Sequence, residues 1–196
     1  MVFGIVVLIF PFVIEDPNCI MSVKTKAEKH TANVSSFENF LNDVEEAVLN
    51  ENYSRIDEQS FESFKFYLYA KPLKRSNLDL VLIIKFNEFN DDIVNLSNDV
   101  YTECLKNNYS KEIRNISSHI SVTTFCCVDK INSYFKRFMN DNLEQDFDFG
   151  RFIVGLSFGG KGLYIMQQKA GLGITKYKKY RKRFFDMFGF LINNNL

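Results

Sequence analysis

The sequence has few of the residues on which most enzyme chemistry depends. It contains no tryptophan, two histidines and four cysteines in 196 residues. Histidine is the usual general base near neutral pH, so mechanisms of that kind have only His30 and His119 available. The Cys-x-x-Cys spacing is typical of zinc sites and redox centres, and the four cysteines do not show it. We therefore expect reduced cytosolic thiols, no metal and no cofactor.

The chain also lacks a net charge, because 24 Lys and Arg balance 24 Asp and Glu. A neutral protein has no long-range field that attracts it to nucleic acid or to an anionic membrane, so any such role requires a local patch. The hydrophobic fraction of 46% and the charged fraction of 24% fit a globular fold and exclude wholesale disorder. The length suits one domain or two small ones.

No apolar run is long enough to cross a bilayer as a helix, which takes roughly 20 residues. The longest one, residues 1–14, contains Gly4 and Pro11 and lacks the basic start and cleavage site of a signal peptide. It could be a buried core strand, a leader outside the domain, or a segment that associates with a membrane. The chain divides into an apolar leader and polar linker at 1–34 and a single α+β domain at 35–196. We expect a cytoplasmic protein.

Hydrophobic periodicity predicts alternating helices and strands. Ser35 and Glu38 have the spacing of a capping box, and apolar residues at helical spacing follow as far as Val48. Apolar and polar residues then alternate over 61–70, which indicates a half-buried strand. The nearly continuous apolar run at 78–86 is typical of a strand buried on both faces.

The remaining elements follow from the same periodicity. Asn90 caps a helix with Ile93, Leu96, Val100 and Cys104 on one face. The later predictions are a strand at 120–128, a short helix at 131–139, strands at 151–158 and 163–168, and a helix at 175–188. The order α-β-β-α-β-α-β-β-α favours a mixed sheet of about five strands with helices packed on it.

A glycine-rich segment at 155–162 has the spacing of a P-loop as far as Lys161. A P-loop then requires Ser or Thr and the start of a helix, whereas Gly162 and a strand-like apolar run follow here. We interpret the segment as the turn of a β-hairpin.

The segment from Ser76 to Val81 resembles the palm of nucleotidyltransferases, which places an acid at the start of a second strand. That family has Gly-Ser after the first strand and Asp-x-Asp at the next. Here 69–70 is Tyr-Ala, and Asn77 replaces the first carboxylate, which leaves Asp79. The resemblance implies a degenerate phosphoryl- or nucleotidyl-transferring site around Asp79. A PD-(D/E)xK nuclease is not indicated, because Ile83 stands where that motif needs an acid before Lys85.

Charge is distributed unevenly along the neutral chain. Eight bases and one acid lie between Lys161 and Asp186, whereas residues 36–60 hold seven acids and one base. The predicted last helix places aromatic residues on one side and basic residues around the rest. The aromatic residues are Tyr177, Tyr180, Phe184 and Phe188.

A basic helix of this kind can bind a phosphate backbone, an acidic protein or an anionic membrane, and it can also stay solvated or neutralise the acidic first helix. The leading hypothesis is a non-catalytic binding protein with nucleic acid as its ligand. The candidate binding residues are Lys161, Lys176, Lys178, Lys179, Arg181, Lys182 and Arg183. Alternatives are the degenerate enzyme around Asp79, a protein-directed interaction or immunity module, and membrane association through residues 1–14. The sequence predicts no oligomeric state.

Overall fold

Seven strands form one mixed sheet in the order β1-β7-β6-β5-β4-β3-β2 in the computed structural model, which describes residues 27–74, 77–110, 120–141, 149–165 and 174–192. The strands are β1 (Glu28–Thr31), β2 (Ser54–Ser60), β3 (Phe64–Pro72), β4 (Leu78–Phe86), β5 (Ile120–Val128), β6 (Phe149–Ser157) and β7 (Gly162–Ile165). The helices are α1 (Phe37–Asn50), α2 (Asp91–Asn108), α4 (Ser133–Asp141) and α5 (Ile174–Phe188), followed by the 3-10 turn η3 (Gly189–Leu191). The α+β class is confirmed, whereas residues 1–26 of the leader and linker expected at 1–34 lie outside the described residues.

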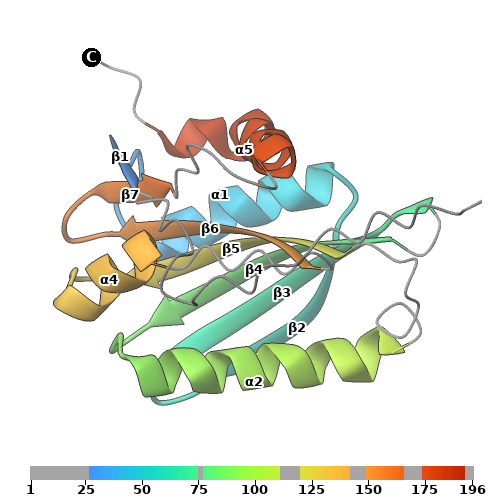
Figure 1. Cartoon of the computed structure of the whole chain (residues 1–196), viewed down its shortest axis with the longest axis horizontal. Helices are drawn as coiled ribbons and strands as arrows, with labels where there is room; N and C mark the ends of the chain where they lie inside the picture. Colours follow the sequence, from blue (N-terminus) through green and yellow to red (C-terminus); the bar gives the residue numbers. More distant parts are fainter. Residues whose placement is uncertain (1–26, 75–76, 111–119, 142–148, 166–173, 193–196) are drawn as a thin grey trace, which may run out of the picture.

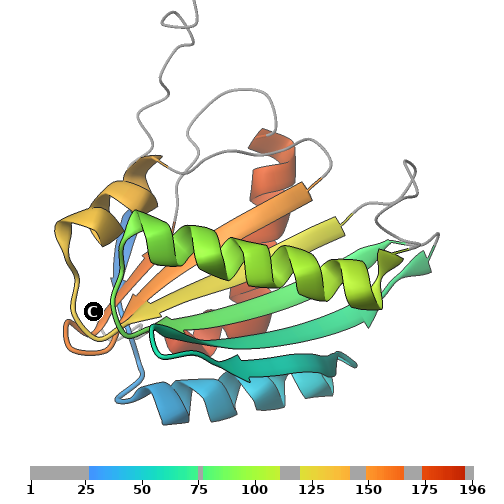
Figure 2. The same cartoon turned by 90° about the horizontal axis from the view of Figure 1, so that it is seen from below.

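The helices lie in two layers, one on each face of the sheet (Figures 1 and 2). α1 and α5 pack on one face, and their apolar side chains join those of the strands in one core cluster. α2 and α4 pack on the other face and form a second cluster. Among the described residues, no helix combines the length and the apolar character needed to span a bilayer.

The central strands run parallel to one another, and the outer ones are antiparallel. β4, β5 and β6 are mutually parallel, while β3 and β2 continue antiparallel on one side and β7 and β1 on the other. All nine residues of β4 and all nine of β5 are buried, because helices cover both faces at the centre. The prediction of a strand at 78–86 that is buried on both sides is confirmed.

Two strands were missed by hydrophobic periodicity, and they account for the difference between five strands and seven. β1 has the sequence EKHT and β2 the sequence SRIDEQS, so neither shows an apolar alternation. Both are edge strands, where one side of the ladder faces solvent and polar residues limit unwanted pairing with other sheets. Without them, the order of helices and strands matches the predicted one. β1 also brings the end of the expected linker into the sheet.

Three local predictions need correction. The N-cap of α1 is Ser36 rather than Ser35, since the Ser36 hydroxyl accepts a hydrogen bond from the Asn39 amide at 3.2 Å. The strand at 61–70 is not half-buried by alternation, since Tyr67 and Tyr69, which fall on the expected polar side of β3, are buried under α1. The buried side of α2 consists of Ser97, Tyr101, Cys104 and Leu105, whereas Leu96 is 47% exposed.

The two ends of the described chain meet at one edge of the sheet. β1 pairs with β7, and Ala32 forms an isolated bridge with Ile192. The Asn33 amide also donates a hydrogen bond to the Leu191 carbonyl at 2.8 Å. Residues shortly before α1 therefore hold the segment that follows α5.

Candidate functional site

A row of polar side chains runs across the neighbouring strands β3, β4 and β5 on the α1/α5 face. Lys71 of β3 pairs in register with Asp79 of β4, and Asp79 pairs with Ser121 of β5. Because side chains alternate between the faces of a strand, aligned residues of neighbouring strands share a face. The row therefore lies under α5, at the end of the sheet where β4 and β5 begin.

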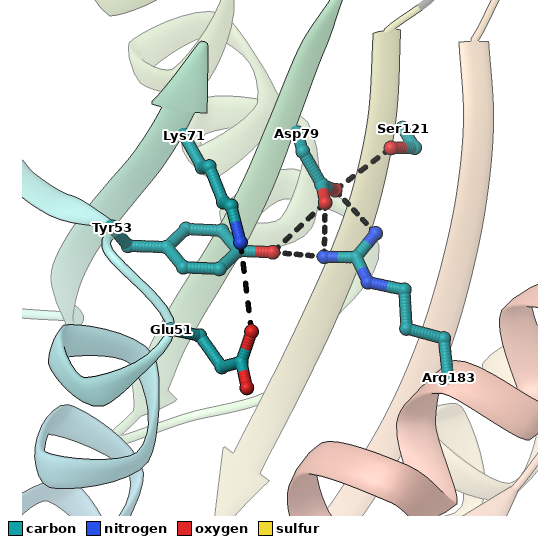
Figure 3. Close-up of polar contacts among 6 residues, drawn as sticks. All are labelled: Glu51, Tyr53, Lys71, Asp79, Ser121 and Arg183. Atoms are coloured by element: carbon teal, nitrogen blue, oxygen red, sulfur yellow. Dashed lines mark hydrogen bonds and ion pairs between the residues drawn. The ribbon is translucent and has the colours of Figure 1, made fainter. Parts of the chain in front are cut away.

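Asp79 is the centre of a hydrogen-bonded cluster built from four segments of the chain (Figure 3). Its Oδ1 accepts from the Ser121 hydroxyl at 2.7 Å and from Arg183 Nη1 at 2.5 Å. Its Oδ2 accepts from the Tyr53 hydroxyl at 2.9 Å and also contacts Arg183 Nη2. The same Nη2 donates to the Tyr53 oxygen. The guanidinium thus engages both carboxylate oxygens, which is the strongest arrangement for such a pair.

This cluster fixes α5 to the sheet. The Asp79 side chain is only 7% exposed, so its charge requires a partner, and Arg183 supplies one from the next layer. Tyr180, Phe184 and Phe188 of α5 are buried beside it, as the predicted aromatic side of the helix requires. The Tyr177 side chain lies outside the described ones. Charge pairing and apolar burial together hold the helix in one orientation.

Proton transfer at neutral pH is not favoured by the cluster. Burial, followed by the charge of Asp79, raises the pKa of Tyr53 well above its ordinary value, so the phenol stays protonated and donates to the carboxylate. Lys71 lies above the Tyr53 ring, with its Nζ 5.5 Å from the centroid, and forms an ion pair with Glu51 at 3.5 Å. Each ionised group therefore already has a partner of opposite charge.

In the nucleotidyltransferase palm that the segment around Asp79 resembles, the Asp-x-Asp carboxylates hold magnesium, and the single carboxylate here was expected to hold a metal only weakly. Both of its oxygens instead accept hydrogen bonds, and a guanidinium occupies the position that a cation would take. Among the residues that the structure describes, no group of three His, Cys, Asp or Glu side chains could hold a metal ion. The geometry makes Asp79 an anchor for α5.

A second arginine of α5 also points toward an internal carboxylate. Arg181 donates to Glu28 of β1 at 2.9 Å, and its guanidinium lies 4.6 Å from the centroid of the Phe185 ring. Glu28 in turn lies 2.9 Å from His30 Nε2. Both arginines among the candidate binding residues therefore take part in contacts within the chain.

The lysines of α5 behave differently from its arginines. Lys178, Lys179 and Lys182 are exposed, and none of them forms an ion pair with another described residue. Asp186 is exposed on the same helix. The side chain of Lys176 lies outside the described ones. The outward surface of α5 thus retains three of the predicted cationic residues, which we call the α5 lysines.

Lys161 lies apart from the α5 lysines. It is exposed in the turn at 158–161 between β6 and β7, and its backbone has a left-handed φ of 43°. Both views place this turn at the opposite end of the sheet from the first half of α5 (Figures 1 and 2). The antiparallel pairing of β6 with β7 confirms the predicted hairpin in place of a P-loop.

A second ion pair lies at the other end of β4, between a buried lysine and an exposed aspartate. Lys85 Nζ is 2.5 Å from Asp129 Oδ1 and 5.4 Å from the centroid of the Phe158 ring. Asp79 and Lys85 are six residues apart on one strand, a separation of about 20 Å at the usual rise of a strand. Lys85 therefore cannot act with Asp79 in one nuclease site.

A scan against models of known protein families finds no match, and neither a search of curated proteins nor one of solved structures finds a significant relative. The function of the protein has to be inferred from its own geometry and charge.

Tyr53 and Ser121, the hydroxyl partners of Asp79, were not among the predicted site residues. Neither residue belongs to a motif, since Tyr53 follows α1 and Ser121 lies in an apolar strand. A signal was present in the polar positions of the central strands, Asp79 and Ser121 among them, because buried polar groups require a partner.

Proposed function

We propose that the protein is a non-catalytic binding protein that holds nucleic acid through the α5 lysines, Lys178, Lys179 and Lys182. The observation that carries this proposal is their exposure on a helix that Arg183 fixes to the sheet. Lysines without an internal partner can neutralise phosphates and release the counterions bound to them. The fixed helix supports binding because the backbone that carries the lysines is already ordered, so binding costs little conformational entropy.

The chemistry of this surface favours the phosphate backbone over the bases. Arginine is the usual reader of guanine edges, and both described arginines of α5 are engaged with carboxylates of the same chain. The aromatic residues Tyr180, Phe184 and Phe188 are buried and offer no stacking surface. We therefore expect binding with little sequence preference and in the weak range of non-specific complexes, with Kd values of about 10⁻⁴ to 10⁻⁶ M at physiological salt.

Salt dependence tests the proposal directly. Three phosphate contacts with duplex DNA predict that log K falls with log salt concentration with a slope of about −3. Fluorescence anisotropy with a labelled duplex, and in parallel with a labelled single-stranded RNA, measures this slope for the full chain. Replacing Lys178, Lys179 and Lys182 by Gln should abolish measurable binding.

A matched control changes the same charge on the opposite layer. Lys106, Lys130 and Lys136 are exposed on α2, after β5 and on α4, and their replacement by Gln should leave affinity and slope nearly unchanged. A salt-independent affinity, or equal losses in the two triple variants, would contradict the proposal.

A further inference from the structure

The two helices on the α1/α5 face of the sheet (Figure 1) carry opposite charges. α1 contains no lysine or arginine, and its exposed side chains include Glu38, Asp43 and Glu46. No cation of another described residue forms an ion pair with these three acids. The α5 lysines are exposed on the neighbouring helix. One face of the molecule therefore has an unpaired acidic region beside an unpaired basic one.

The acidic region includes a pocket. Asp43, Glu46, Ala47 and Asn50 of α1 line it together with Phe190 of η3, and its volume is about 270 Å³. Phe190 is 42% exposed, and Leu49 of α1 is 50% exposed. A pocket with carboxylates and apolar surface suits a lysine side chain, whose methylene stem packs on apolar atoms while its ammonium group meets the acids.

The type of partner follows from the presence of both charges. Nucleic acid complements only the α5 lysines, and a basic protein complements only the acids of α1. A second copy of this chain complements both regions at once, because a two-fold axis between the helices brings α1 of each copy over α5 of the other. Such an interface is isologous, the commonest kind in soluble oligomers.

We propose that two copies of the chain form a symmetric dimer through the α1/α5 face, with α5 lysines of each copy in the acidic pocket of the other. Pairs between exposed charges are screened by salt, with a Debye length of about 10 Å at 0.1 M. The dimer should therefore form at low ionic strength and dissociate at high ionic strength. This inference does not depend on nucleic-acid binding, although both would use the same lysines.

Charge reversal on each helix in turn tests this interface. Lys178→Glu with Lys182→Glu reverses the charge of two of the three α5 lysines, and Asp43→Lys with Glu46→Lys reverses the charge of both acids that line the pocket. Each variant alone should be monomeric in analytical ultracentrifugation at about 0.02 M salt, where the unmodified chain should be dimeric. An equimolar mixture of the two variants should dimerise, because the reversed positions on α5 of one copy then face the reversed positions on α1 of the other, and the unmodified α1 and α5 also face each other.

A control and a competition experiment complete the test. Lys130→Glu with Lys136→Glu, two exposed positions away from this face, should leave the dimer intact. Adding unlabelled duplex DNA should dissociate the dimer if the lysines serve both partners. A monomeric unmodified chain at low salt, or a mixture of the two variants that stays monomeric, would overturn the dimer.

The two proposals can fail separately. The Asp43→Lys and Glu46→Lys variant keeps the α5 lysines and removes two acids, so it should bind nucleic acid at least as tightly as the unmodified chain. Dimerisation without any binding of nucleic acid would leave the dimer standing and remove the proposed function. Salt-dependent nucleic-acid binding by a chain that is always monomeric would do the reverse.

Discussion

The inner and outer sides of α5 carry the same sign of charge in different surroundings. Arg183 reaches a carboxylate that is almost completely buried, and Arg181 reaches Glu28 at the edge of the sheet. The α5 lysines stay exposed. Arginine suits the inner positions because its planar guanidinium can bind both oxygens of a carboxylate, whereas lysine carries a compact, strongly hydrated charge that suits the surface. Counting basic residues alone therefore overstates the charge available to a ligand.

The largest expected effect comes from breaking the inner pair. Arg183→Met leaves the Asp79 carboxylate buried without a cation, which should lower the free energy of unfolding by about 3 to 5 kcal/mol. Urea denaturation followed by circular dichroism measures the change. Adding Asp79→Leu to the same chain should restore most of the lost stability, because the second substitution removes the unpaired charge. A double variant as unstable as the single one would contradict this account.

The hydroxyl of Tyr53 should contribute less than Arg183. Tyr53→Phe removes one hydrogen bond to the carboxylate, and the free energy of unfolding should fall by about 1 to 2 kcal/mol at pH 7.

The effect of Tyr53 also depends on pH. Folding raises the pKa of Tyr53, so the unfolded phenol ionises first as the pH rises above about 10, and the contribution of the hydroxyl declines there. The difference between Tyr53→Phe and the unmodified chain should shrink from pH 9 to pH 11 in urea titrations, in an interval set by the ordinary tyrosine pKa of about 10. A difference in the free energy of unfolding that stays constant from pH 9 to pH 11 would mean that folding does not raise the pKa of Tyr53.

The outer arginine should matter still less to stability. Arg181 and Glu28 are 35% and 25% exposed, and pairs in contact with water typically contribute less than about 1 kcal/mol. Arg181→Gln should therefore destabilise the chain by less than about 1 kcal/mol, and raising the salt concentration should reduce the effect further. A loss as large as that of Arg183→Met would show that the two arginines do not differ as proposed.

The smallest stability effect per position should come from the α5 lysines. Replacing all three by Gln should change the free energy of unfolding by no more than about 0.5 kcal/mol per position, since they have no partner among the described residues. The same variant is the one expected to lose nucleic-acid binding. A large loss of stability would mean that these lysines have a structural role. The loss of nucleic-acid binding in this variant could then come from unfolding rather than from the missing charge.

Much of the fold could be predicted because its central elements have strong periodicity. β4 is an unbroken apolar run apart from Asp79 and Lys85, and α5 places Tyr180, Phe184 and Phe188 at helical spacing. The edge strands β1 and β2 could not be found in the same way, because half of each faces solvent and their pairing depends on distant strands.

The candidate site was predictable in part. The excess of basic residues on the last helix is visible in the sequence, and the spacing of the aromatic residues indicates which side is buried. The division of roles between Arg183 and Lys182, which are adjacent in sequence, depends on the position of Asp79 one layer away. A contact between residues that are 104 positions apart has no local signal.

The pairing of β1 with β7 has a consequence for synthesis on the ribosome. Glu28 pairs with Ile165 and accepts a hydrogen bond from Arg181, and Asn33 donates one to Leu191. All three partners lie late in the sequence, so β1 can pair only after almost the whole chain has been translated. Until then, the backbone of residues 28–31 has no partner strand within the sheet and remains open to other nascent chains. Deleting residues 189–196 should therefore reduce the soluble yield more than their small share of the core would suggest.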